Sequence, residues 1–263
     1  DGLVLLGCGK MGSAMLEGWL AKGLPASSVW VVDPKPSDWL QSTGVNLNAT
    51  LPAAPAVVLV AVKPQMMADA LPTLQAMGNG ETLFVSVAAG TTIGYFENVL
   101  GGDTPIVRAM PNTPAAISKG ITAIVGNAKA GSRSLDEAET LLSAVGDVVR
   151  LSEEAQIDAV TGVSGSGPAY VFHMIECMAA AGVAQGLPEE LAMQLAKATV
   201  AGAGALAMQA EEDPAQLRVN VTSPNGTTQA ALEVLMDETE GFLPLLKRAV
   251  AAAADRSREL ANG

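Results

Sequence analysis

The sequence predicts an α/β protein: an N-terminal Rossmann-type doubly wound sheet followed by an all-helical domain. Three observations predict it. The chain opens with a short apolar run, a glycine-rich turn and an amphipathic stretch, which is the order strand, loop, helix. Apolar runs and helix-compatible segments then alternate to about residue 152. From about Glu153 the pattern is helical only, so we expect domains over residues 1–152 and 153–263.

The first strand, turn and helix are predicted at Leu3–Leu6, Gly7–Gly12 and onward to Lys22. The turn reads Gly7, Cys8, Gly9, Lys10, Met11, Gly12, a G-x-G-x-x-G motif. Its glycines permit a tight turn, the close approach of a pyrophosphate and helix–strand contact. A second strand, Val29–Val32, ends in Asp33, where an acid can hold a ribose 2′-hydroxyl. We therefore predict a dinucleotide site here.

Five further apolar, β-rich runs extend the predicted sheet. They are Ala56–Val62, Leu83–Val87, Ile106–Met110, Ala123–Gly126 and Val148–Leu151. Met66–Met77 and Ser134–Val145 are compatible with helices between them. Continuous apolar strands indicate a sheet covered on both faces. Ligands of such sheets bind beyond the carboxyl ends of the strands. The residues that follow the runs, Lys63–Gln65, Ala88–Gly90 and Pro111–Pro114, are therefore expected to outline a cleft.

Two long segments of the helical half lack a polar face. Pro168–Ala184 carries one formal charge, Glu176, and Leu191–Ala210 carries only Lys197. A helix that is apolar all round must be buried, and a domain of this size is too small to cover two of them. A membrane is the alternative, but Ala and Gly supply little transfer energy and the charges would be costly there. We therefore expect burial against a second subunit.

The segment Thr222–Thr228 is a turn with four hydroxyls in seven residues, set before a helical run that begins near Gln229. Such a turn offers several N–H groups and the positive end of a helix dipole to one anion. The alternative is an ordinary helix connection with an N-cap, which needs only one hydroxyl. The density of hydroxyls favours a binding loop.

Composition narrows the class of protein. A net charge of −12 argues against nucleic acid as a partner. Cys8 and Cys177 are too few and too poorly placed for a disulfide framework, which favours a reducing cytoplasm. The single histidine, His173, lies in an apolar helix, so we predict no metal site and no Ser-His-Asp set.

Five motifs, in order along the chain, resemble those of pyrroline-5-carboxylate reductase. They are Gly7–Gly12, Ala61–Gln65, Arg108–Pro114, Thr161–Tyr170 and Leu217–Thr228. The glycine motif is common to many dehydrogenases, whereas Ser-Gly-Ser-Gly-Pro-Ala-Tyr and Thr-Ser-Pro-x-Gly-Thr-Thr are specific. The resemblance implies NAD(P)H-dependent reduction of a cyclic imine acid to L-proline. It also implies an interlocked helical homodimer that can assemble further.

The resemblance implies that the turn binds the substrate carboxylate and that Thr228, the candidate catalytic residue, hydrogen-bonds the ring nitrogen. The implied substrate-binding residues are Glu154, Glu211, Ser223, Asn225, Gly226, Thr227 and Thr228. The two glutamates are equally compatible with solvated helix-end acids. Val219 and Asn225 depart from the family, which often has Asp and Gly there. We expect these departures to affect the conformation of the loop rather than the reaction type.

The candidate cofactor-binding residues come from the motifs, from the loops beyond the strands and from the resemblance. They are Gly7, Cys8, Gly9, Lys10, Met11, Gly12, Asp33, Lys35, Asn48, Ala61, Val62, Lys63, Pro64, Ala89 and Asn220. The family's residue at Asn220 reaches the cofactor from the partner subunit. Asp33 favours NADH, whereas Lys35 and Lys10 can offset its repulsion of a 2′-phosphate. NADP is the family default and NAD is kept open.

Two other functions remain open from the sequence. One is a dehydrogenase acting on 3-hydroxy acids, which needs a lysine base in the helical domain. Lys197 is the only lysine between Glu153 and Lys247, and it lies inside an apolar run. The other is a dinucleotide-sensing protein without catalysis, against which the intact Thr222–Thr228 turn argues.

Overall fold

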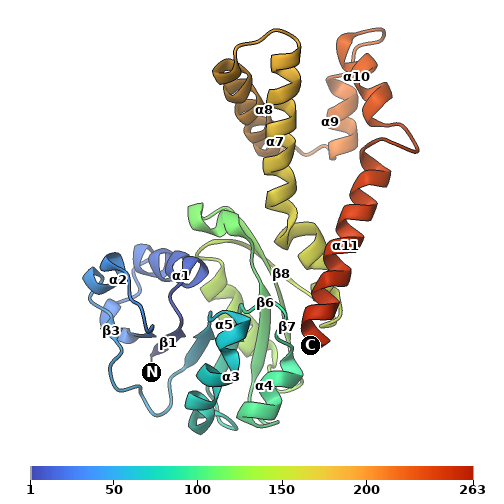
Figure 1. Cartoon of the computed structure of the whole chain (residues 1–263). Coiled ribbons are helices and arrows are strands. Elements are labelled where there is room, and N and C mark those ends of the chain that lie inside the picture. The colour runs from blue at the N-terminus through green and yellow to red at the C-terminus, as the bar shows by residue number, and fades with distance from the viewer. Residues whose placement is uncertain (1, 263) are drawn as a thin grey trace. The chain divides into compact units, whose positions relative to one another are not determined.

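The structure is a computed structural model that describes residues 2–262. It forms two compact units (Figure 1). One comprises the residues up to Gly165 together with those from Ala253 onward, and the other is Ser166–Ala252. The division thus falls later than the expected position after residue 152. The reason is packing, because Ile157 lies in the core beside the sheet and Ser257 donates a hydrogen bond to Asp158 at 2.6 Å.

The described residues of the first unit form one eight-stranded sheet of order β3-β2-β1-β4-β5-β6-β7-β8. Its strands are β1 Leu3–Leu6, β2 Val29–Val32, β3 Asn46–Leu47, β4 Val57–Val60, β5 Leu83–Ser86, β6 Ile106–Met110, β7 Gly120–Gly126 and β8 Gly146–Arg150. Every pairing is parallel except that of β6 with β7. The β6–β7 connection contains only a 3₁₀ turn, Thr113–Ile117, which is too short for a parallel crossover.

Both faces of this sheet are covered over β1, β4, β5 and β6, as the continuous apolar runs predicted. The edge strand β8 differs, because none of its residues is buried. Along β1, Leu5 packs into one cluster with Met15 and Trp19, while Val4 packs into another with Phe96. Successive residues of a strand face opposite sides, which explains why the run is apolar throughout. The covering helices are α1 Lys10–Ala21, α2 Asp38–Ser42, α3 Met67–Ala70, α4 Ile93–Leu100, α5 Ser132–Leu142 and α6 Gln156–Val160.

The segment Met66–Met77, expected as a helix, is α3 followed by a 3₁₀ stretch over Leu71–Met77. Pro72 explains the change, because proline lacks the N–H that an α-helical turn needs. A second irregularity follows α6, where Thr161–Gly165 form a π-helix that leads toward α7. Single π-helical turns occur frequently at functional sites.

The second unit is helical. Its elements are α7 Gly167–Ala184, α8 Glu189–Gln209, α9 Pro214–Asn220, α10 Thr227–Leu235 and the first part of α11, Phe242–Asn262. The buried cluster of α7 and α8 consists of Ala179, Ala192 and Ala196, small residues that permit close approach. Large apolar side chains stay exposed, among them Phe172 at 59% and Met208 at 77%.

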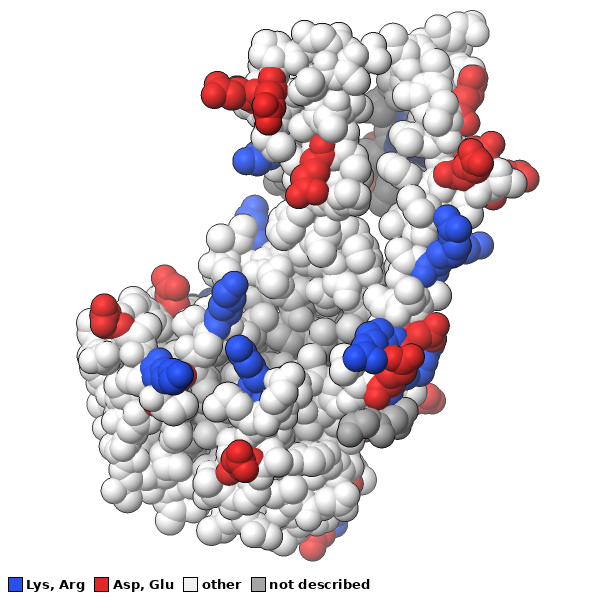
Figure 2. Space-filling view, viewed as in Figure 1, with Lys and Arg blue, Asp and Glu red and all other residues white. Residues whose placement is uncertain are grey.

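The apolar surface of α7 and α8 therefore remains largely unburied in one chain. Figure 2 shows wide uncharged areas between scattered charged side chains over the helical unit. By length and composition alone, α8 could cross a membrane, and only 11% of its apolar window is buried. The same observation is expected of a helix that a second subunit covers.

Candidate active site

Each of the three glycines of the G-x-G-x-x-G motif is suited to its position for a different structural reason. Gly7 has φ +89, and a Cβ there would lie 2.9 Å from Val62 Cγ1. A Cβ on Gly12 would lie 2.4 Å from the carbonyl oxygen of Gly7, so α1 packs against the strand only with glycine there. At Gly9, by contrast, no described atom lies within 4 Å of an added Cβ. This open side is where a pyrophosphate can approach the backbone.

The beginning of α1 is suited to an anion. Gly9 is its N-cap, and no side chain within residues 2–262 caps the helix there. The first-turn N–H groups lack intrahelical partners, and the helix dipole is positive at this end. The loop and the helix terminus therefore fit the dinucleotide predicted from the motif.

Asp33 lies beside the same loop and is held by backbone donors. Its Oδ2 accepts a hydrogen bond from the Cys8 N–H at 2.8 Å, and its Oδ1 accepts one from the Lys35 N–H at 2.8 Å. Asn48 completes the group, because its Oδ1 accepts from the Asp33 N–H and its Nδ2 donates to the Asp33 carbonyl. The structure thus brings together Asp33, Lys35 and Asn48, all of which the sequence placed in the cofactor site.

Cys8 is shielded rather than reactive. Burial, and secondarily the negative charge of Asp33, raises the pKa of the Cys8 thiol to about 11. The thiol therefore stays protonated at neutral pH, and its contribution to the site comes from its backbone N–H.

Three loops that carry candidate cofactor-binding residues lie side by side at the carboxyl edge of the sheet. β1, β4 and β5 are adjacent and parallel, so the loops that follow them share one edge. The chain leaves β1 toward β2 on one side and continues from β4 on the other, which makes this the topological switch point. Ala61, Val62, Lys63 and Pro64 follow β4, and Ala89 follows β5. Lys63 and Ala89 are exposed there.

The Thr222–Thr228 turn connects α9 to α10 in the second unit. Asn225 has φ +58, the left-handed region that glycine favours and asparagine tolerates. This explains how asparagine replaces the family's frequent glycine. The Asn225 N–H donates to Gln229 Oε1 at 2.8 Å. Thr222 Oγ1 donates to the Arg218 carbonyl at 2.6 Å, so this hydroxyl satisfies one of the carbonyl groups in the last turn of α9.

The N-terminus of α10 is open to an anion. Gly226 is the N-cap, and no side chain in the described part of the chain caps the helix. Thr227 and Thr228 form its first turn, where N–H groups have no intrahelical partner. Ser223 and Thr227 are exposed and Thr228 is half-buried. The turn has the donors that a carboxylate needs.

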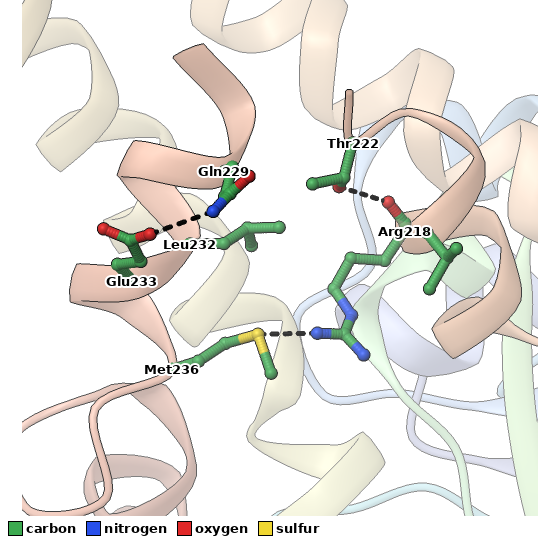
Figure 3. A pocket seen from close by; sticks show the side chains of 7 residues that line it. Arg218, Thr222, Gln229, Leu232, Glu233 and Met236 are labelled. Carbon is green, nitrogen blue, oxygen red and sulfur yellow. Dashed lines mark hydrogen bonds between the residues drawn. The ribbon is translucent and has the colours of Figure 1, made fainter. Parts of the chain in front are cut away.

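A cavity of about 480 Å³ lies between α9 and α10 (Figure 3). Its lining includes Arg218, Val219, Thr222, Gln229 and Met236. The Arg218 guanidinium donates to Met236 Sδ, which bridges the two helices. Val219, where the family often has aspartate, lines this cavity and does not belong to the turn itself.

The remaining site candidates have different surroundings. Glu154 Oε1 accepts hydrogen bonds from Arg108 Nη1 at 2.7 Å and from the Ile93 N–H at 2.8 Å, within the first unit. Glu211 is exposed ahead of α9. Asn220 Oδ1, in the second unit, accepts from Gln216 Nε2 at 2.8 Å.

Two polar residues of the first unit, Arg108 and Asn112, belong to the Arg108–Pro114 motif, but neither could be assigned an individual role from the sequence. Arg108 is only 5% exposed, although it lies within an apolar strand run. Asn112 donates through Nδ2 to the Ser164 carbonyl and accepts through Oδ1 from the Ile121 N–H. It thereby anchors the π-helix to the end of β6. A charged residue inside an apolar run, as at Arg108, was the signal available in the sequence.

A glycine-rich loop on a doubly wound sheet, followed by a helical unit with an uncapped, hydroxyl-rich turn, is the arrangement expected of a dinucleotide-dependent oxidoreductase. Two family models match the chain accordingly. Residues 3–90 match the model described as NADP oxidoreductase, coenzyme F420-dependent, and residues 154–260 match that for pyrroline-5-carboxylate reductase dimerisation. The chain belongs to the pyrroline-5-carboxylate reductase family, uses an NADP-type cofactor and carries that family's dimerisation domain.

Relatives of this family match over nearly the whole chain. The pyrroline-5-carboxylate reductase of Pseudomonas aeruginosa is 41% identical over 99% of this chain and 97% of its own, and that of Synechocystis is 42% identical over 98% and 97%. The solved structure of the Coxiella burnetii enzyme has a TM-score of 0.92 at 33% identity, covering 99% of this chain and 98% of its own. The Plasmodium falciparum enzyme, solved with NADP bound, has a TM-score of 0.84 at 27% identity over 99% and 98%.

Proposed function

We propose that this chain reduces 1-pyrroline-5-carboxylate to L-proline with NADPH. The observation that carries the proposal is the uncapped, hydroxyl-rich N-terminus of α10 in a chain that also has an open Gly9 loop. The first accommodates a small carboxylate and the second a dinucleotide. The names of the relatives support the same substrate.

The turn is proposed to act as the anchor for the substrate carboxylate. Ser223, Asn225, Gly226 and Thr227 surround the helix N-terminus, where backbone N–H groups and the dipole favour an anion. Anchoring the carboxylate fixes the imine ring, which is the main contribution that orientation makes to a hydride transfer.

The bound NADPH supplies the hydride, which adds to the imine carbon while the nitrogen gains one proton. Thr228 is proposed to hydrogen-bond the ring nitrogen and so to orient the C=N bond. Its hydroxyl donates to the neutral imine and accepts from the N–H of the protonated imine. A threonine hydroxyl is a weak acid, so its role is to hold the nitrogen rather than to protonate it. Glu211, exposed ahead of α9, is proposed to favour a protonated, positively charged imine through its charge.

The complete site is proposed to require a homodimer, which can assemble into a larger oligomer. The exposed apolar surface of α7 and α8 supports this, as does the family's dimerisation model over residues 154–260. Asn220 is proposed to reach the cofactor of the partner subunit. Two cysteines without a disulfide, Cys8 and Cys177, are compatible with a cytoplasmic enzyme.

The test follows NADPH oxidation on addition of 1-pyrroline-5-carboxylate, with NADP⁺ plus a panel of 3-hydroxy acids as the comparison. We expect turnover with the imine acid alone. Turnover with a 3-hydroxy acid would favour the dehydrogenase alternative. NADPH binding without any turnover would indicate a dinucleotide-sensing protein.

A further inference from the structure

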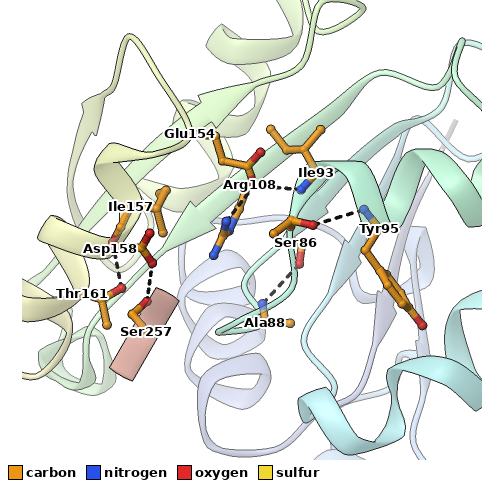
Figure 4. A network of polar contacts seen from close by, with 11 residues as sticks. Ser86, Ala88, Ile93, Tyr95, Arg108, Glu154, Ile157, Asp158, Thr161 and Ser257 are labelled. Carbon is orange, nitrogen blue, oxygen red and sulfur yellow. Dashed lines mark hydrogen bonds and ion pairs between the residues drawn. The ribbon is translucent and has the colours of Figure 1, made fainter. Parts of the chain in front are cut away.

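Arg108 and Glu154 form a largely buried ion pair next to the cofactor edge of the sheet (Figure 4). The Arg108 side chain is 7% exposed and that of Glu154 is 31% exposed. Burying an ion pair costs desolvation, and an apolar pair of similar volume often stabilises a fold as well or better. Fold stability is therefore a weak explanation for charges at these two positions.

Glu154 fixes the point at which α4 begins. Its Oε1 accepts the Ile93 N–H, the first of α4, while the Thr92 hydroxyl accepts the Tyr95 N–H of the same turn. A carboxylate at the positive end of a helix is held by the dipole as well as by the hydrogen bond. Arg108, in the middle of β6, orients that carboxylate from the sheet side.

Fixing Ile93 also fixes the loop of residues 87–92 after β5. The near end of this loop is held by Ser86 Oγ, which accepts the Ala88 N–H at 3.3 Å. Its middle lies against the end of α11, where a Cβ on Gly90 would be 3.4 Å from Leu260 Cβ. The loop contains Ala89 and is next to the β4 loop, which is itself next to the β1 loop along the carboxyl edge of the sheet. With the cofactor bound at this edge, as proposed above, the position of the loop would affect cofactor binding.

We propose that Arg108 and Glu154 are positioning residues, whose ion pair holds the β5–α4 loop in the conformation that NADPH binds. This assigns Glu154 an indirect role in place of the direct substrate contact implied by the family resemblance. The inference depends on the proposed cofactor site. Its test is binding of NADPH without substrate, so it can fail while the reductase activity is confirmed.

The experiment compares Arg108→Met, Glu154→Gln and the double variant by fluorescence titration with NADPH. Each single variant should weaken NADPH binding roughly 10- to 100-fold, because small displacements of a positioning element have effects of that size. The double variant should be no worse than the weaker-binding single variant, since both changes remove one interaction. KM for 1-pyrroline-5-carboxylate, at saturating NADPH, should change little.

A matched control is Arg150→Met, which breaks an exposed ion pair with Glu139 away from the β5–α4 loop and should leave NADPH affinity unchanged. If Arg108→Met does not fold, Arg108→Lys tests the same point, with intermediate NADPH affinity expected.

Two results would overturn the proposal. One is a raised substrate KM in Glu154→Gln with normal NADPH affinity, which makes Glu154 a substrate ligand. The other is a lower unfolding temperature with normal NADPH affinity, which makes the pair purely structural.

Discussion

The Asp33 carboxylate accepts a hydrogen bond from the backbone N–H of Cys8, with 2.8 Å between Oδ2 and nitrogen. The acid at the end of β2 therefore holds the glycine-rich loop directly. Its other oxygen, Oδ1, accepts a hydrogen bond from the Lys35 N–H. The carboxylate is therefore held between the glycine-rich loop and the first residues after β2. We propose that Asp33 acts on the cofactor in two ways, through its charge and through the loop that it holds.

Replacing Asp33 with asparagine separates these two effects. Asparagine keeps one acceptor oxygen for the Cys8 N–H but removes the negative charge that repels a 2′-phosphate. We expect the ratio of kcat/KM for NADPH to that for NADH to rise roughly tenfold, which corresponds to about 1.4 kcal/mol. Steady-state kinetics with both cofactors measure it. An unchanged ratio would show that the 2′ position lies beyond the influence of Asp33.

The glycines of the loop give a second, matched pair of variants. Gly9→Val should abolish NADPH binding and leave folding unchanged, because the added side chain enters space that the described chain leaves open. Gly12→Val should instead lower the unfolding temperature, because its Cβ would lie 2.4 Å from the Gly7 carbonyl oxygen. Cofactor titration and thermal unfolding distinguish the two. Normal NADPH affinity in Gly9→Val would make the turn purely structural.

Removing the hydroxyl of Thr228 and removing that of Ser223, both in the turn before and at the start of α10, should have different kinetic effects. Thr228→Ala should lower kcat about 10- to 100-fold, because a hydrogen bond that strengthens in the transition state is worth about 1–3 kcal/mol. Ser223→Ala should mainly raise substrate KM, since a carboxylate anchor acts equally in ground and transition states. NADPH affinity serves as the internal control and should hold in both. A raised KM with normal kcat in Thr228→Ala would place Thr228 in the carboxylate anchor only.

Much of the fold could be predicted because its signals are local. The β1 run Leu3–Leu6 and the β6 run Ile106–Met110 match the observed strands residue for residue. Parallel strands buried on both faces leave continuous apolar runs that turns interrupt. The short strand β3 and the π-helix Thr161–Gly165 have no such signal, since two residues carry no period and a π turn keeps a helical composition.

Features of the candidate site could be predicted where backbone conformation demands a residue type, and less so where tertiary contacts decide. Gly7 and Gly12 are required by close approach, and the motif shows them directly. Glu154 illustrates the other case, because its partners Arg108 and Ile93 are far away in the sequence. Only the folded sheet brings β6 and the start of α4 to that carboxylate.

The isolated monomer of this chain should not be a stable folded species, because its helical unit buries too little apolar surface. The buried cluster of that unit contains three alanines, whereas Phe172, Leu206 and Met208 are more than half exposed, at 59%, 54% and 77%. We expect a second copy of the chain to bury this exposed apolar surface. Light scattering at micromolar concentration should show a dimer or larger species, with an unfolding temperature that falls on dilution. A well-folded monomer under those conditions would contradict this.

The most direct measurement follows the hydride itself. NADPH deuterated at the transferring position of C4 is incubated with the enzyme and 1-pyrroline-5-carboxylate, and the product is examined by mass spectrometry and NMR. We expect L-proline with one deuterium on the ring carbon that was the imine carbon, next to nitrogen and remote from the carboxylate. Enzyme-dependent NADPH oxidation that yields unlabelled proline, or no proline, would contradict direct hydride transfer to the C=N bond.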